Sequence, residues 1–247
     1  MADIPVQEFE QLKSVSLFRE LSQVEFSKVI QLAYRRKLLD GEFLFMEADP
    51  ATTLYVLVKG RLKLTQVTPE GQQVILRYIT PGEAIGVIAV LSGALYPVSA
   101  QAVESSQLLG WENTAMRRLM SQVPSISMNA LQILAGRVRE FQDRVRELST
   151  ERVERRIART LLRLARHTGR KVNEGVLIDL PLSRQDLAEM TGTTLYTVSR
   201  LLSQWETRGL IKSKREQVTI CSPHDLVIIA EDLPPRDVHL DIPGEQL

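Results

Sequence analysis

The chain has 247 residues and a formal net charge of +1, with 44% hydrophobic and 25% charged residues. This composition is typical of a folded globular protein and excludes a disordered or membrane-embedded chain. The longest apolar stretch, residues 84–91, is far shorter than the ~20 residues that span a bilayer, and the first residues lack the pattern of a secretory signal. We therefore expect a soluble protein of the cytoplasm that makes no membrane contact.

Basic residues are concentrated in one part of the chain, and the chain has a single cysteine. Residues 151–220 carry 14 Lys or Arg against 8 Asp or Glu, whereas residues 221–247 carry one Arg and six acidic residues. The surplus lies where a phosphate-binding surface would need it, although a solvated helix face would show the same surplus. The single cysteine, Cys221, excludes an internal disulfide and any metal site built from several cysteines.

Between residues 37 and 111, short β-rich segments alternate with turns that contain glycine or proline. The segments are residues 54–58, 62–64 and 74–79. Their regular spacing predicts an all-β sandwich or jelly-roll-like barrel. Residues 8–32 show mixed helical periodicity and are expected to form short helices packed on the barrel.

A change of period marks residues 124–150, which are expected to form one long helix. Its apolar residues recur at steps of three and four with charged residues around them, which is the pattern of a coiled-coil seam. A stripe this narrow favours pairing with a second copy of the chain, and burial in the chain's own core is the alternative. The seam residues are Leu131, Leu134, Val138, Phe141, Val145 and Leu148.

Beyond this helix, residues 153–167 predict a second amphipathic helix. Residues 169–175 are expected to form a polar loop, and the alternation of apolar residues from 178 to 182 predicts a strand. The last segment, residues 231–247, contains three prolines, is acidic and lacks periodicity. We therefore expect it to be a poorly ordered tail.

Residues 183–211 carry the strongest local pattern in the chain. A helix over residues 184–190 would present Leu187 and Ala188 inward, and Gly192 supplies a turn in which a positive φ costs little. Thr193 and Thr194 are suited to cap the helix that follows. This spacing predicts a helix-turn-helix, with a plain helical hairpin in a core as the alternative. The inward residues of the second helix are expected to be Val198, Leu201, Leu202 and Trp205.

The outer face of that second helix is expected to contact DNA. In a helix-turn-helix the first residues of this helix reach base edges in the major groove, and an arginine such as Arg200 can bind guanine through two hydrogen bonds. Short hydroxyl side chains near helix starts suit phosphate oxygens. Two β-like runs after Gly209, joined by Lys214-Arg215, predict a wing. The expected DNA-binding residues are Ser183, Thr194, Leu195, Tyr196, Thr197, Ser199 and Arg200.

Taken in order, these pieces resemble the CRP/FNR family of bacterial regulators; the matching segments are residues 41–45, 54–60, 81–86, the long helix and 187–211. The resemblance implies an α+β fold with an N-terminal cyclic-nucleotide-binding-like β-roll, a long dimerisation helix and a C-terminal winged helix-turn-helix. It also implies a homodimer that regulates transcription from two half-sites about one helical turn (~34 Å) apart, with RNA polymerase as a further partner. The expected domains are the sensor over 1–123, the dimerisation helix over 124–150, the DNA-binding domain over 151–230 and the tail over 231–247.

The expected sensor departs from the cyclic-AMP-binding members of the family. Their ribose-binding Glu matches Val87, their phosphate-binding Arg-Ser pair matches Tyr96-Pro97, and their adenine-contacting hydroxyl residues match Phe141 and Gln142. An aromatic ring and a proline cannot replace a guanidinium group on a cyclic phosphate. Cyclic AMP is therefore not expected to be the effector.

Two iron cofactors of the family are not expected either. The oxygen-sensing branch holds an iron–sulfur cluster through cysteines near its N-terminus, and residues 1–220 contain no cysteine. Haem-binding members use His or Cys ligands, and residues 1–166 contain no histidine. The three histidines of the chain, His167, His224 and His239, lie outside the expected sensor and are expected at the surface.

The turn at Gly86 and Val87 is similar to that of nitrogen regulators that bind 2-oxoglutarate, and Arg137 matches an anion-binding position of that branch. The second arginine of the branch has no counterpart here, and its helix Glu corresponds to Gln142. Control by an unidentified small effector, or by the abundance of the protein alone, stays open. The candidate effector-binding residues are Gly86, Val87, Ile88, Tyr96, Arg137, Phe141 and Gln142.

Tyr196 stands where many family members have a Glu that accepts a hydrogen bond from a cytosine amino group. A phenol hydroxyl and ring cannot reproduce the carboxylate contact. We therefore expect the half-site geometry of the family with a changed preference at the base pair that faces Tyr196.

Two other classes of function serve as alternatives. An effector-binding module that acts through protein contacts without DNA would show no salt-dependent affinity for DNA. An enzyme is not expected, because the sequence shows no Ser/His/Asp or Cys/His set, metal-binding cluster or phosphate-binding glycine loop.

Overall fold

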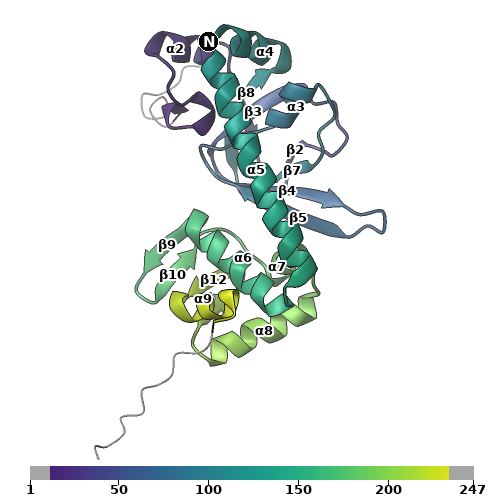
Figure 1. The fold of residues 1–247 in the computed structure, drawn as a ribbon, viewed down its shortest axis with the longest axis vertical. Coiled ribbons are helices and arrows are strands. Elements are labelled where there is room, and N and C mark those ends of the chain that lie inside the picture. The colour runs from purple at the N-terminus through teal and green to yellow at the C-terminus, as the bar shows by residue number, and fades with distance from the viewer. Residues whose placement is uncertain (1–11, 234–247) are drawn as a thin grey trace, which may run out of the picture. The chain divides into compact units, whose positions relative to one another are not determined.

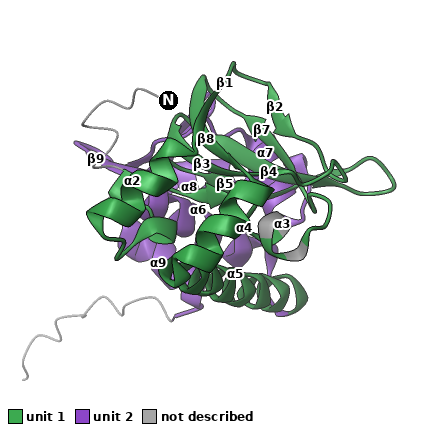
Figure 2. Ribbon diagram, turned by 90° about the horizontal axis from the view of Figure 1, so that it is seen from above, with its two compact units in different colours: residues 1–149 green, residues 150–247 purple. Residues whose placement is uncertain are grey.

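The computed structural model describes residues 12–233, apart from the side chains of Ala89, Val90 and Ser92. The chain divides into two compact units, residues 1–149 and 150–247, which Figure 2 colours separately. Each unit is described by itself below.

The first unit is built on two antiparallel four-stranded sheets with interleaved strand orders, β1-β8-β3-β6 and β2-β7-β4-β5. Leu57, Leu62, Ile79 and Leu108 belong to the apolar cluster that joins them. The strands predicted within residues 54–58, 62–64 and 74–79 are confirmed as β3, β4 and β5. The strands are β1 Tyr34–Leu38, β2 Phe43–Phe45, β3 Thr53–Lys59, β4 Leu62–Val67, β5 Gln73–Ile79, β6 Ala84–Ile85, β7 Ser99–Ala102 and β8 Ser106–Glu112.

Short helices cover a second apolar cluster of the same unit, which contains Phe18, Phe26 and Trp111. The Trp111 indole N–H donates to the carbonyl of Val29, 2.7 Å away, so the buried ring has its polar atom satisfied. The helices predicted within residues 8–32 are confirmed from residue 12 onward; residues 1–11 lie outside the described part of the chain. The helices are η1 Ser16–Phe18, α2 Gln23–Gln31, α3 Val87–Ser92 and α4 Asn113–Gln122.

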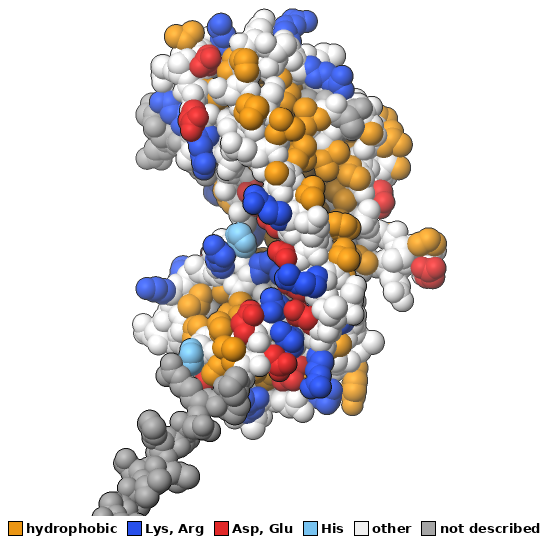
Figure 3. Space-filling view, in the orientation of Figure 1, with side chains coloured by type: hydrophobic (Ala, Val, Ile, Leu, Met, Phe, Trp, Pro, Cys, Tyr) orange, Lys and Arg blue, Asp and Glu red, His pale blue; other side chains and the backbone are white. Residues whose placement is uncertain are grey.

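The long helix is α5, Pro124–Thr150, which Figure 1 shows running beside the sheets. Its first turns pack on the chain's own core, because Ile126 and Ala130 are fully buried and the Asn129 amide donates to the carbonyls of Leu17 and Arg19. Leu134 also packs against that core. The other seam residues are exposed, and Figure 3 shows hydrophobic side chains along this line of the helix. Their exposed fractions are Leu131 54%, Val138 55%, Phe141 68%, Val145 46% and Leu148 47%.

Over residues 150–233, the second unit packs four helices with a small antiparallel sheet of order β11-β12-β10-β9. The predicted amphipathic helix is α6; of the residues expected to face inward, Ile157, Leu161 and Leu164 are buried and Leu162 is half-buried. The elements are α6 Val153–Thr168, β9 Gly169–Val172, β10 Gly175–Ile178, α7 Arg184–Thr191, α8 Leu195–Thr207, β11 Ile211–Lys214, β12 Gln217–Ile220 and α9 Pro223–Glu231.

Two local predictions in this unit are wrong, and one helix was not predicted. Residues 169–175 form a β-hairpin with β10 rather than a loop, because an edge strand exposes polar residues such as Arg170 and Lys171. The strand predicted over 178–182 ends at Ile178; the apolar residues that follow it are buried without strand pairing. Helix α9 was missed, and residues 231–233 of the expected tail form its end, with the Leu233 N–H donating to the Ile228 carbonyl. Residues 234–247 lie outside the described part of the chain.

Candidate nucleic-acid interface and sensor site

The turn between α7 and α8 has the geometry of a helix-turn-helix. Gly192 adopts a left-handed conformation with φ 59° and ψ 48°, and its N–H donates to the Ala188 carbonyl, which ends α7. Thr194 then caps α8, because its hydroxyl oxygen accepts from the Thr197 N–H at 3.2 Å. The caps stop one helix and start the next within three residues, so the turn holds its shape.

The inner faces of α7 and α8 lie against each other, with Leu187 and Ala188 on α7 buried as the sequence predicted. The helix-turn-helix prediction is confirmed. Trp205 closes this core, and its indole N–H donates to the Glu154 carboxylate on α6 at 3.3 Å. The buried residues of α8 are Val198, Leu201, Leu202 and Trp205.

The outer face of α8 carries the side chains expected to meet DNA. Leu195 is 48% and Tyr196 77% exposed, and Arg200 one turn further on is also exposed. Ser199 is half-buried. The outer face of α8 is therefore open to solvent, whereas its inner face is buried.

Ser183 lies at the start of α7, where its hydroxyl takes part in a capping box with Asp186. The hydroxyl oxygen accepts from the Asp186 N–H at 3.0 Å and donates its proton to the Asp186 carboxylate at 2.6 Å. The carboxylate accepts the Ser183 N–H as well, at 2.8 Å. A hydroxyl has one proton to donate, so a phosphate contact by Ser183 would have to break this bond.

The predicted wing is the hairpin of β11 and β12. Glu206 on α8 accepts from the Ser213 N–H at 2.8 Å, and Lys212 pairs with Glu174 of the β9–β10 turn at 2.6 Å. The hydrogen bond between Lys212 and Glu174 lowers the pKa of the Glu174 carboxyl and raises the pKa of the lysine. Between the wing and the start of α7 lies a cavity of about 430 Å³; its basic lining residues are Arg184, Lys214 and Arg215.

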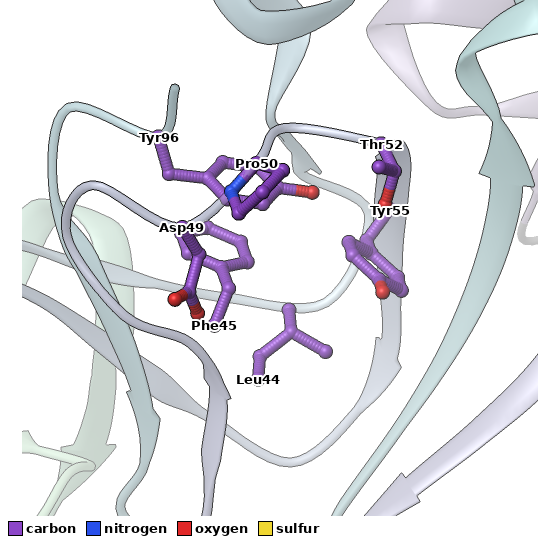
Figure 4. Close-up of a pocket in the computed structure, with 7 residues that line it drawn as sticks. All are labelled: Leu44, Phe45, Asp49, Pro50, Thr52, Tyr55 and Tyr96. Atoms are coloured by element: carbon purple, nitrogen blue, oxygen red, sulfur yellow. The ribbon is translucent and has the colours of Figure 1, made fainter.

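In the first unit, Tyr96 is the residue that the resemblance places opposite the phosphate-binding arginine of cyclic-AMP-binding regulators. Its ring stacks on Phe45 with centroids 3.6 Å apart, and its hydroxyl donates to the Thr53 carbonyl at 2.6 Å. Burial raises the pKa of Tyr96, so the phenol stays neutral. The cavity beside it, of about 340 Å³, is shown in Figure 4, lined by Leu44, Phe45, Asp49, Pro50, Thr52, Tyr55 and Tyr96.

The turn at Gly86 adds to this packing. Gly86 has φ +81°, and a Cβ atom there would lie 2.9 Å from the Thr53 carbonyl oxygen, so a side chain cannot be accommodated without a shift. Val87 is buried and Ile88 is 49% exposed. Of the expected effector residues, Gly86 and Tyr96 lie close together, with 3.4 Å between that Cβ position and the Tyr96 ring.

Arg137 belongs to a network of four charged residues, Arg77, Glu83, Arg137 and Glu140, which we call the charge network. Its guanidinium donates to Glu83 at 3.1 Å and to Glu140 at 2.8 Å. Arg77 also donates to Glu83. Two carboxylates of the chain therefore bind Arg137, the residue proposed from the resemblance to bind an anion, and neither contact was expected from the sequence.

A spacing signal existed for one of these pairs, since Arg137 and Glu140 lie three residues apart on one helix. Glu83 lies 54 residues from Arg137, and nothing local indicates that contact. Phe141 and Gln142, the remaining expected effector residues, are exposed on α5.

Within residues 12–233, no three or more His, Cys, Asp or Glu side chains are grouped so that they could hold a metal ion. Across the same residues, no helix combines the length and the apolar character needed to cross a membrane.

Each of the two units matches a known protein family. Residues 35–123 match the cyclic nucleotide-binding domain family, and residues 155–227 match the Crp-like helix-turn-helix domain family. The global nitrogen regulator of Nostoc sp. is 28% identical over 210 residues, which cover 84% of this chain and 92% of that protein. The transcriptional activator protein anr of Pseudomonas aeruginosa is 27% identical over 195 residues, covering 79% and 80%.

A solved structure described as a transcriptional regulator of the CRP family from Thermus thermophilus is 25% identical, with a TM-score of 0.69 over 79% of this chain and 96% of that chain. FixK2 from Bradyrhizobium japonicum has the same fold, with a TM-score of 0.71 and 24% identity over 80% and 96%. The predicted α+β fold with a β-roll and a winged helix-turn-helix is confirmed. The chain belongs to the CRP/FNR family of DNA-binding transcription regulators.

Proposed function

We propose that this regulator binds DNA as a homodimer, with one copy of α8 in the major groove of each of two half-sites. The observation that carries this proposal is the exposed outer face of α8 above a fully buried inner face. A helix held by its core on one side and unpartnered on the other is suited to enter a groove. The half-sites would lie about 34 Å apart, one turn of B-DNA.

The homodimer would form along the seam of α5. Leu131, Val138, Phe141, Val145 and Leu148 are each about half exposed or more in the single chain. Burial of this stripe against a second copy would remove apolar surface from water, which is the main favourable term in stable subunit association. Leu134 would lie at the edge of the dimer interface, because part of its side chain already packs on the core of the first unit.

We assign base contacts to Tyr196 and Arg200 and supporting contacts to Leu195 and Ser199. Thr194 and Thr197, whose hydroxyl oxygens lie 3.0 Å apart at the start of α8, would contact phosphate oxygens. Ser183 remains a capping residue in this proposal, since its hydroxyl proton is already donated to Asp186.

The effector would not be cyclic AMP. By the resemblance, the buried phenol of Tyr96 would stand in place of the phosphate-binding arginine, and Val87 offers no carboxylate for a ribose. Arg137 is engaged by Glu83 and Glu140, so an anionic effector would have to displace a carboxylate of the protein itself. Control by a different small molecule, or by the abundance of the regulator, fits these contacts, and neither haem nor an iron–sulfur cluster is part of the proposal.

The proposed place of action is the cytoplasm, at promoters, with RNA polymerase as the partner of the DNA-bound dimer. The relatives are regulators and not enzymes, and the proposal includes no catalysis.

Binding of the full chain to DNA across a salt series tests the proposal. DNA selected from a random pool would be used beside a scrambled probe of equal length. We expect the logarithm of affinity to fall steeply with the logarithm of salt concentration, because phosphate contacts release counterions. Absence of selected DNA together with a flat salt response would instead support a module that acts through protein contacts.

A further inference from the structure

Arg156, on the first turns of α6, makes three hydrogen bonds to backbone carbonyls in the second unit. Its Nη1 donates to Glu151 at 2.9 Å, its Nε donates to Thr191 at 3.1 Å and its Nη2 donates to Gly192 at 3.3 Å. A planar guanidinium presents donors in fixed directions from three nitrogens and can hold acceptors that lie apart, whereas an ammonium presents its donors from a single nitrogen.

The three acceptors come from two places that matter for the helix-turn-helix. Thr191 and Gly192 form the end of α7 and its turn, where helix carbonyls have no partner of their own. A positive charge there also interacts favourably with the negative end of the α7 dipole. Glu151 directly follows Thr150, the last residue of α5. The side chain of Arg156 thus links Glu151, which follows the long helix, to the turn that precedes α8.

A second contact from the same stretch of α6 supports this role. Glu154 accepts from the Trp205 indole N–H at 3.3 Å, so α6 also contacts α8 directly. Arg155 provides a contrast on the same helix. Its Nε donates to the Ala230 carbonyl of α9 at 3.3 Å and its guanidinium lies 3.6 Å from Asp232, so it serves α9 and not the turn.

We propose that Arg156 is a positioning residue that fixes the helix-turn-helix relative to the residues after α5 and thereby sets the half-site spacing that the dimer accepts. This rests on the proposed function, in which α5 joins the two copies. In that arrangement, the hydrogen bonds of Arg156 link the turn before α8 to Glu151, the residue that directly follows the dimer helix. Without the three bonds, each helix-turn-helix would still fold and still contact one half-site.

The test uses the full chain as Arg156→Gln and Arg156→Lys, with Arg155→Gln as the matched control. Affinity is measured for selected DNA with the natural spacing, for the same half-sites moved apart or together by one and two base pairs, and for a single half-site. The wild type should lose about tenfold or more in affinity when the spacing changes. Arg156→Gln should bind the natural spacing about tenfold more weakly while the misspaced probes and the single half-site change less than threefold.

Arg156→Lys should give an intermediate spacing preference, because an ammonium group cannot reach all three carbonyls in the same directions. Arg155→Gln should keep the spacing preference of the wild type. A uniform loss on every probe, equal in Arg156→Gln and Arg155→Gln, would reduce Arg156 to a stabilising residue and overturn the proposal. So would an unchanged spacing preference in both Arg156 variants.

Amide hydrogen exchange of the DNA-free protein separates this inference from the proposed function. Exchange over residues 191–197 should quicken at least tenfold in Arg156→Gln and stay at the wild-type rate in Arg155→Gln. Equal rates in all three proteins would contradict the positioning role even if DNA binding followed the proposal. If the wild type bound no DNA, the proposed function and the spacing role would both be contradicted. Faster exchange in Arg156→Gln would then show only that Arg156 stabilises the turn between α7 and α8.

Discussion

The positions expected to carry function are arranged in opposite ways in the two units. On α8, Leu195, Tyr196 and Arg200 lie exposed on a helix whose other face is fully buried. In the first unit, Tyr96 and Arg137 both bind groups of the chain itself. Tyr96 donates to the Thr53 carbonyl, and Arg137 donates to the carboxylates of Glu83 and Glu140. A surface left unpaired is suited to a large partner, whereas a site already satisfied admits only a ligand that outcompetes its own side chains.

The largest effect that would sharpen this comparison is expected from Tyr96→Ala. Removal of a buried ring that stacks on Phe45 should lower the free energy of unfolding of the first unit by ~3–5 kcal/mol. Urea unfolding followed by circular dichroism measures the change. Tyr196→Ala is the matched control, since a 77% exposed ring should contribute within ~0.5 kcal/mol. Equal losses in the two variants would mean that Tyr96 is not a packing residue.

Arg200→Ala should give the next largest effect, on binding and not on stability. Loss of a bidentate guanine contact removes ~1–3 kcal/mol of discrimination at one position in each half-site. Selection of bound DNA by the variant should show one relaxed position per half-site, with the melting temperature unchanged. Unaltered site preference would show that α8 enters the groove in another register.

Tyr196→Glu tests the base preference of the same face. A carboxylate can accept a hydrogen bond from the cytosine amino group, which a phenol replaces only poorly. We expect the selected half-site to change at one base pair, with about tenfold better binding of the variant to a site that offers cytosine there. Competition between probes that differ at that pair measures the ratio. The idea fails if both proteins rank the four bases alike.

Glu83→Gln would break the charge network of the sensor. The loss of a charged acceptor shared by Arg77 and Arg137 should lower the free energy of unfolding by about 1 kcal/mol, since all these side chains are only partly buried. Asp143→Asn, which removes the exposed Arg146–Asp143 pair, should cost almost nothing. If the two variants were equally stable, the charge network would not hold the sensor together.

The smallest expected effect is that of cyclic AMP, which should shift neither the melting temperature nor the DNA affinity of the wild type. A ligand stabilises the state that it binds in proportion to its affinity, so thermal shift across a concentration series is a direct check. A concentration-dependent rise would show that the packing of Tyr96 opens to admit a nucleotide.

The helix-turn-helix was predictable because its constraints are local. Ala188, Gly192 and Val198 lie within ten residues, and each needs a particular size or backbone conformation. The first unit was predictable only as a set of strands. Its decisive contacts join residues far apart in sequence, 43 residues between Tyr96 and Thr53 and 54 between Arg137 and Glu83, so no periodicity reports them. The hairpin of β9 and β10 was missed for a third reason. The edge strand β9 exposes polar side chains, so its sequence has the composition of a loop.

The seam prediction shows how far pattern alone reaches. The a/d spacing found a stripe that is exposed over most of its length, yet Leu134 packs on the chain's own core together with Ile126 and Ala130. A heptad pattern cannot distinguish the part of a helix that lies on its own domain from the part that leaves it. That distinction depends on where the strands and short helices end.

The two tryptophans of the chain fall one in each unit, and both are fully buried. Trp111 donates to a neutral backbone carbonyl, whereas Trp205 donates to a carboxylate. Their indoles therefore lie in different electrostatic fields, and their emission should differ in wavelength. Replacing either one with Phe would leave a single tryptophan, so that the loosening of the first unit and of the DNA-binding unit could be followed separately, one in each variant, without any added dye.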